Sequence, residues 1–218
     1  MTCLFAVDDG LLPLVQAGGT IGWILLGLSI VALALAFLHA WTIRRSRLLP
    51  KQQIDSIAAG LRDGNVDDVL EWCQSSVSDS FPARITAAAI TRMRQSPLGA
   101  LEVHDAAEEA GQAQVARLER SLEGLSVIAA IAPLLGLMGT VLGMVDAFDA
   151  IASQGPQAAG ELASSISLAL VTTLLGLAVA IPCVAMHAWF RVRLESIAAE
   201  AGLVMEAVLE PLAEMGDA

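Results

Sequence analysis

An uncharged run from Gly124 to Val145 most constrains what this chain can fold into. At about 1.5 Å per helical residue the run can cross a hydrocarbon layer of about 30 Å. It also contains a proline, three further glycines and a threonine, which a simple lipid anchor does not need. At helical spacing its small residues share one side with a single hydroxyl: Ala129, Pro133, Gly136, Thr140, Gly143 and Ala147. This stripe predicts close approach by another helix.

The composition describes an integral membrane protein with some soluble mass. Among 218 residues, 56% are hydrophobic and only 16% are charged, and three apolar runs could each span a bilayer. We therefore predict an all-α integral membrane protein with three transmembrane helices. Its expected surroundings are membrane lipids. The formal net charge of -11 speaks against a nucleic-acid partner.

The basic residues predict the orientation of these helices. Ten of the twelve Lys and Arg residues lie between Arg44 and Arg120, and the other two are Arg191 and Arg193. By the positive-inside rule, both basic regions face the cytoplasm. The N-terminus is then outside and the C-terminus inside, an arrangement that three crossings satisfy.

This topology divides the chain into seven parts. We expect spans two and three to extend into the cytoplasm as long helices. The predicted parts are a short periplasmic N-terminus (1–19), a first span (20–43), a cytoplasmic helical region (44–123), a second span (124–150), a periplasmic loop (151–161), a third span (162–190) and a cytoplasmic C-terminal helix (191–218).

Local signals predict details of the cytoplasmic region. Asn65 is expected to cap a helix that ends at Cys73, and Asp79 or Ser80 to cap the next helix. Trp72 and Cys73 are expected in a small apolar core. The three cysteines fall in three different environments, so we expect no disulfide, and no spacing of ligands suggests a metal or cofactor.

The third span repeats the features of the second. Its small or weakly polar side includes Thr172, Thr173 and Gly176, and Pro182 lies within it as Pro133 lies within span two. We expect the small residues, Gly139 and Gly176 among them, to join neighbouring subunits in a homo-oligomer. From the residues alone, the pattern fits either plain helix packing or an ion path.

Two acidic residues mark the outer end of span two. Asp146 and Asp149 would form an acidic mouth if they were repeated around a ring. They are equally typical of solvated carboxylates at a helix end. The sequence leaves both interpretations open.

Three motifs resemble one family of membrane proteins. They are Ala-Pro-Leu-Leu-Gly-Leu-x-Gly-Thr-Val-x-Gly-Met at 132–144, Leu-Val-Thr-Thr at 170–173 and Gly-Leu-Ala-Val-Ala-Ile-Pro at 176–182. They are similar to the MotA/TolQ/ExbB proton-channel family, and most similar to its ExbB branch. The resemblance implies a bacterial inner-membrane subunit that forms a ring, usually a pentamer.

The resemblance also implies a division of labour. Thr140 and Thr173, with Thr172 beside them, would line the ion path. A single-span partner of the ExbD/TolR class would supply the proton-carrying aspartate. The ring would use proton motive force to drive a TonB-type transducer.

One position departs from the family pattern. ExbB and TolQ commonly carry a glutamate five residues before the threonine of span three, and here that position is Leu168. This departure leaves open a TolQ-like motor for envelope maintenance, a non-conducting scaffold of the same fold, and sodium in place of protons. An enzyme is the least supported class, since no nucleophile, base or metal ligand lies at membrane depth.

Overall fold

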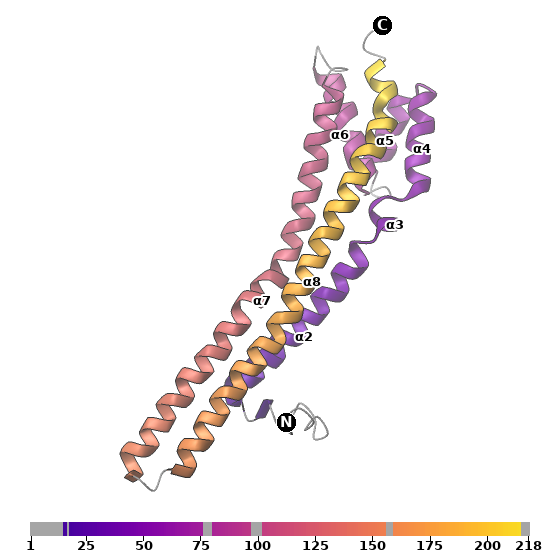
Figure 1. Ribbon diagram of the computed structural model, residues 1–218. Helices are drawn as coiled ribbons and strands as arrows, with labels where there is room; N and C mark the ends of the chain where they lie inside the picture. Colours follow the sequence, from indigo (N-terminus) through magenta and orange to yellow (C-terminus); the bar gives the residue numbers. More distant parts are fainter. Residues whose placement is uncertain (1–14, 17, 76–79, 97–101, 156–158, 215–218) are drawn as a thin grey trace. The chain divides into compact units, whose positions relative to one another are not determined.

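The computed structural model describes residues 15–16, 18–75, 80–96, 102–155 and 159–214, and every secondary-structure element in these ranges is a helix (Figure 1). This confirms the predicted all-α fold. The helices are α2 (Gly19–Thr42), α3 (Arg45–Leu48), α4 (Lys51–Arg62), α5 (Val66–Gln74), α6 (Phe81–Gln95), α7 (Val103–Gln154) and α8 (Ala159–Glu214).

Three of these helices are long and apolar enough to cross a membrane: α2, α7 and α8. Their hydrophobic runs contain no charged residue that would interrupt the apolar surface, and a helix satisfies its own backbone groups in lipid. The three predicted spans therefore have their counterparts in the structure. α7 has 52 residues and α8 has 56, so both continue well beyond the length needed for one crossing.

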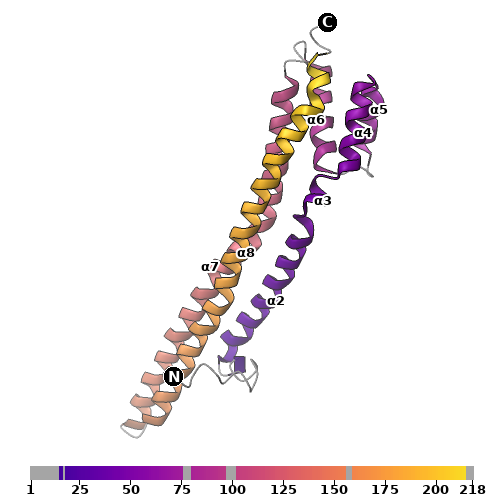
Figure 2. The same cartoon turned by 45° about the vertical axis from the view of Figure 1, so that its right-hand side comes forward.

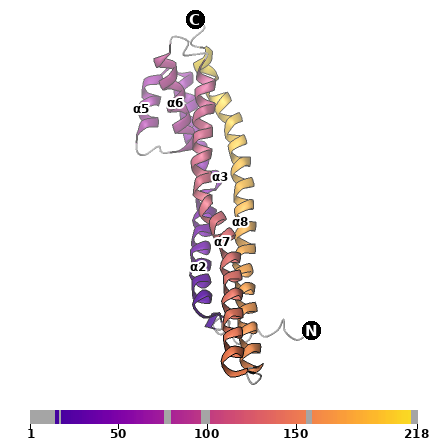
Figure 3. The same ribbon diagram turned by 90° about the vertical axis from the view of Figure 1, so that its left-hand side faces the viewer.

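The chain forms two compact units, and α7 and α8 contribute to both. The first comprises residues 1–37 and 123–188, of which the described part is α2 up to Phe37 with the apolar parts of α7 and α8. Its core brings Ile21 and Leu25 of α2 against Ala132 of α7 and Ala180 of α8. Figure 3 shows α7 and α8 running side by side here. Within the first unit, α2 thus packs on an α7–α8 pair.

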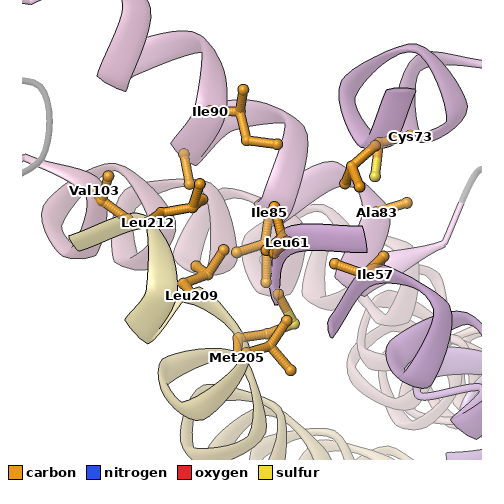
Figure 4. Packing of buried hydrophobic residues seen from close by; sticks show 13 residues of the cluster. Ile57, Leu61, Cys73, Ala83, Ile85, Ile90, Val103, Met205, Leu209 and Leu212 are labelled. Atoms are coloured by element: carbon orange, nitrogen blue, oxygen red, sulfur yellow. The ribbon is translucent and has the colours of Figure 1, made fainter. Parts of the chain in front are cut away.

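The second unit comprises residues 38–122 and 189–218. Helices α4, α5 and α6 pack against one another (Figure 2). Figure 4 shows the shared core, to which α7 contributes Val103 and α8 contributes Met205, Leu209 and Leu212. The last part of α8 therefore packs with the first part of α7 in one core.

Of the predicted N-caps at Asn65 and Ser80, one is correct and one is wrong. The Ser80 side chain accepts a hydrogen bond from the Ala83 N–H at 3.4 Å and so caps α6, as expected. Asn65 precedes α5, but its side chain makes no capping bond. Its ψ of 54° lies outside the extended region that an N-cap needs, because the preceding turn, with Gly64 at φ +76°, bends the chain there.

Cys73 lies in the apolar core of the second unit, and Trp72 lies outside this core. Cys73 is buried, whereas Trp72 is 36% exposed, so its predicted place in the core is wrong. Neighbouring residues on a helix point about 100° apart, and α5 is too short to bury both. The hydrophobic side of α5 follows Val69 and Cys73, four residues apart.

Candidate ion-pathway site

The apolar parts of α7 and α8 meet at glycines. A Cβ on Gly136 would lie 3.0 Å from the Thr172 carbonyl oxygen, and one on Gly176 would lie 2.6 Å from the Ala132 carbonyl oxygen. Both neighbours are backbone atoms, which cannot rotate away as a side chain could. The two helix backbones therefore approach as closely as glycine permits, as small residues allow in membranes.

The same close approach continues along the helix pair. A Cβ on Gly139 would collide with the side chain of Thr172. One on Gly143 would lie 2.8 Å from the Ala169 Cβ and 3.0 Å from the Ser165 carbonyl oxygen. We call the contact made by Gly136, Gly139, Gly143 and Gly176 the glycine seam.

The glycine seam closes within one chain. The neighbours of its four glycines belong to the same subunit, so these residues no longer argue for contacts between subunits.

The buried stripe of α7 also differs from the predicted one. Ala132 and Gly139 are buried, while Pro133 and Thr140 are half-buried at its side. Helix α7 continues through Pro133, and α8 continues past Pro182, which is exposed.

Two adjacent threonines of α8 direct their hydroxyls to one acceptor. The Thr173 hydroxyl donates to the Gly136 carbonyl oxygen at 3.1 Å. The Thr172 hydroxyl lies 2.7 Å from the Ala169 carbonyl oxygen and 3.3 Å from that of Gly136. A hydroxyl in an apolar layer must find such a partner. The carbonyl of Gly136 is accessible to both because no side chain separates the helices.

The three threonines differ in how open they are. Thr172 is only 4% exposed, whereas Thr140 and Thr173 are half-buried. Thr140 donates to the Leu137 carbonyl oxygen of its own helix at 2.6 Å. It follows Gly136 by four residues, so it lies one turn along the same helix face. Of the three threonines, Thr140 and Thr173 are thus the ones that remain partly accessible beside the glycine seam.

Proton storage needs a group that this region lacks. No Asp, Glu, His, Lys or Arg occurs in 124–145 or in 162–186. A threonine hydroxyl can hold water or pass on a hydrogen bond, but it does not ionise near neutral pH. These two segments therefore contain no carboxylate or imidazole that could hold a proton. Among the described residues, no group of three or more His, Cys, Asp or Glu side chains is placed to hold a metal ion.

The remaining predicted positions lie on exposed surface. Asp146 and Asp149 are both exposed near the end of α7, one turn apart. The backbone carbonyl of Asp149 accepts a hydrogen bond from the Ser153 hydroxyl at 2.9 Å. Leu168 of α8 is 40% exposed, outside the glycine seam.

Sequence reasoning missed the acceptor of the threonine hydroxyls. The carbonyl of Gly136 belongs to the backbone, so no residue type identifies it. The contacts of the Ala132 and Ser165 carbonyls with Gly176 and Gly143 could not be predicted for the same reason. The signal that was available is the pairing of small residues in both helices, which indicates close approach but not which carbonyl lies opposite.

Comparison with models of protein families identifies a family for this chain. Residues 77–201 match the model of the MotA/TolQ/ExbB proton channel family. The matched segment includes all four glycines of the seam and all three threonines. A search of curated proteins finds no match.

Proposed function

The chain belongs to the MotA/TolQ/ExbB proton channel family, and on that premise we propose that it is the ring-forming subunit of an inner-membrane motor driven by protons. In this proposal the ring, a pentamer, encloses a single-span partner of the ExbD/TolR class. Proton flow then performs mechanical work on a TonB-type transducer of outer-membrane import.

The proposal rests mainly on one observation: partly accessible threonine hydroxyls lie in apolar segments that contain no carboxylate. Thr140 and Thr173 are partly accessible beside the glycine seam, and the apolar segments around them, 124–145 and 162–186, hold no Asp, Glu, His, Lys or Arg. Such a surface can position water and accept or donate hydrogen bonds for a carboxylate that another chain brings. A partner with an intramembrane aspartate would complete the path.

The surface of the long helices supports association with other chains. Only 28% of the most apolar window of α7, and the same share for α8, is buried within the single chain. Large apolar side chains such as Leu137, Leu142 and Phe148 are more than half exposed. Lipid and neighbouring subunits would cover them, and this surface, in place of the glycine seam, now supports the proposed homo-oligomer.

The proposal is tested by reconstituting the chain with its partner. The partner gene is sought next to this gene, as one encoding a single span with an aspartate. The co-purified complex in liposomes should dissipate an imposed pH gradient, and changing the partner's aspartate to asparagine should abolish the flux. Replacing sodium by choline should leave the rate unchanged. A complex that conducts only with sodium would contradict the choice of ion.

Leu168 favours a second candidate, a scaffold of the same fold that does not conduct. An apolar residue stands there, 40% exposed, where ExbB-like and TolQ-like sequences commonly have a carboxylate. In the same liposomes, a scaffold would assemble with the partner and show no flux. Introducing the acid by L168E should then create conduction, whereas a natural channel needs no such change. A TolQ-like role is distinguished by which envelope defect deletion of the gene causes.

A further inference from the structure

A basic groove lies in the second unit where the apolar helix α2 ends. Its volume is about 810 Å³, and its lining includes Arg44, Arg45, Lys51, Arg193, Ser46 and Trp189. The remaining lining residues are apolar, and none is acidic. Four positive charges therefore surround one groove in a chain whose net charge is -11.

One of the four bases is already paired. Arg45 binds Glu200 of α8 through its Nε, 2.9 Å from each carboxylate oxygen, and through Nη2. Within the described part of the chain, no ion pair involves Arg44, Lys51 or Arg193. The Arg44 guanidinium instead lies over the Trp41 ring, 5.4 Å from its centre. Three bases thus face the groove without an ion pair of their own, and Lys51 and Arg193 share with Arg45 the single negative charge of Glu200.

Aromatic side chains place this groove at a membrane surface. Trp41 near the end of α2 is 56% exposed and Trp189 of α8 is 61% exposed. Exposed tryptophans at the end of an apolar helix are typical of the headgroup region. Ala40 and Ile43, near the end of α2, line the groove and give it an apolar side. The site therefore combines positive charge, a hydroxyl and an adjoining apolar face.

We propose that the groove binds the headgroup of an anionic phospholipid of the adjoining leaflet. The phosphate would take hydrogen bonds and charge from Arg44, Lys51 and Arg193, and the acyl chains would lie along the exposed side of α2. A soluble phosphate would use the bases but not the tryptophans or the apolar side of the groove. This site goes beyond the proposed function, since it requires neither conduction nor a partner.

Native mass spectrometry of the detergent-solubilised chain with added phosphatidylglycerol tests the site. The wild type should retain phosphatidylglycerol and release phosphatidylcholine, which carries no net charge. The variant R44Q/K51Q/R193Q should lose affinity by about fivefold for each base, on the order of a hundredfold in all. The matched control R62Q/R92Q/R94Q makes the same charge change at exposed bases of α4 and α6 and should bind as the wild type does.

Competition with inorganic phosphate and additional variants distinguish a lipid site from a site for free phosphate. Excess inorganic phosphate should not displace the lipid, whereas displacement would identify a site for free phosphate and overturn the lipid assignment. R44K/R193K keeps the charges and should retain binding. If the triple variant does not fold, R44Q and K51Q alone should each show the fivefold loss. Equal binding of both lipids, or equal losses in the triple variant and its control, would overturn the proposal.

Discussion

At the scale of single residues, the side chains that matter most are those whose partners the structure defines. Thr173 and Thr172 share the Gly136 carbonyl, while Thr140 uses its own helix. These bonds tie the hydroxyls to the backbone without closing off Thr140 and Thr173. A hydroxyl that already has an acceptor still offers lone pairs to water or to a partner's carboxylic acid.

The Arg45–Glu200 pair predicts a pH dependence of stability. The hydrogen bonds from Arg45 lower the pKa of Glu200 below its ordinary value of 4.5. A depressed pKa contributes stability above the unfolded value, and this contribution is lost as the pH falls through the folded value. R45Q should therefore lower the melting temperature at pH 6 and make less difference at pH 3.

The effect of R45Q should be small because both side chains are exposed. The control is the pair E200Q and R45Q/E200Q, in which the titrating carboxyl is gone. Their difference in melting temperature should not change with pH. A difference between wild type and R45Q that stays constant from pH 6 to pH 3 would show that the pair does not act in this way.

Asp146 and Asp149 predict a dependence on salt. If repeated around a ring, these exposed carboxylates would raise the local concentration of cations, and salt would screen them. D146N/D149N should slow proton flux in liposomes more at about 10 mM salt than at about 150 mM. D105N/E108Q removes two acids from the other end of α7 and should slow it less. Equal slowing at both salt concentrations would leave the two residues as solvated helix-end groups.

At the scale of helices, the glycine seam holds α7 against α8. G176A would bring a Cβ against the Ala132 carbonyl, so it should destabilise the chain by about 1–3 kcal/mol. G27A is the matched control, because Gly27 of α2 has nothing within 4 Å of an added Cβ. Thermal unfolding in detergent measures both. A G176A chain as stable as G27A would mean that the helices do not approach so closely.

The predicted orientation of the helices needs reporters other than Cys73. Burial raises the pKa of the Cys73 thiol to about 11, so it would resist labelling from either side of a membrane. E71C on α5 and S153C near the end of α7 are exposed positions in a chain freed of its native cysteines. An impermeant maleimide added to spheroplasts should label position 153 and reach position 71 only after permeabilisation. The reverse pattern would invert the topology.

The sequence predicts long elements better than the contacts between them. The apolar runs predicted α2, α7 and α8, because length and hydropathy are local properties. Ser80 was recognisable as a cap, but Asn65 was not excluded, because the turn at Gly64 determines its backbone angles. Spacing also could not tell Thr172 from Thr173. Adjacent residues differ by about 100° in direction, so a small error in helix phase changes which one is buried.

At the scale of the whole molecule, the chain consists of two units that differ in composition. The first holds the apolar helices and their glycine seam, and the second is a helical core with charged surfaces. Membership of a proton channel family gives the first unit its proposed role. A ring with a partner that carries an aspartate would supply a carboxylate, which the apolar segments 124–145 and 162–186 lack.

The most direct test of this account is proton flux through the reconstituted complex of this chain with its single-span partner. The wild-type complex should conduct, T140S/T173S should keep most of the rate, and T140V/T173V should assemble with the partner but lose most of it. Valine preserves shape and removes the hydroxyl, so the comparison isolates hydrogen bonding. A T140V/T173V complex that conducts as fast as the wild type would contradict the account and leave both threonines as packing residues.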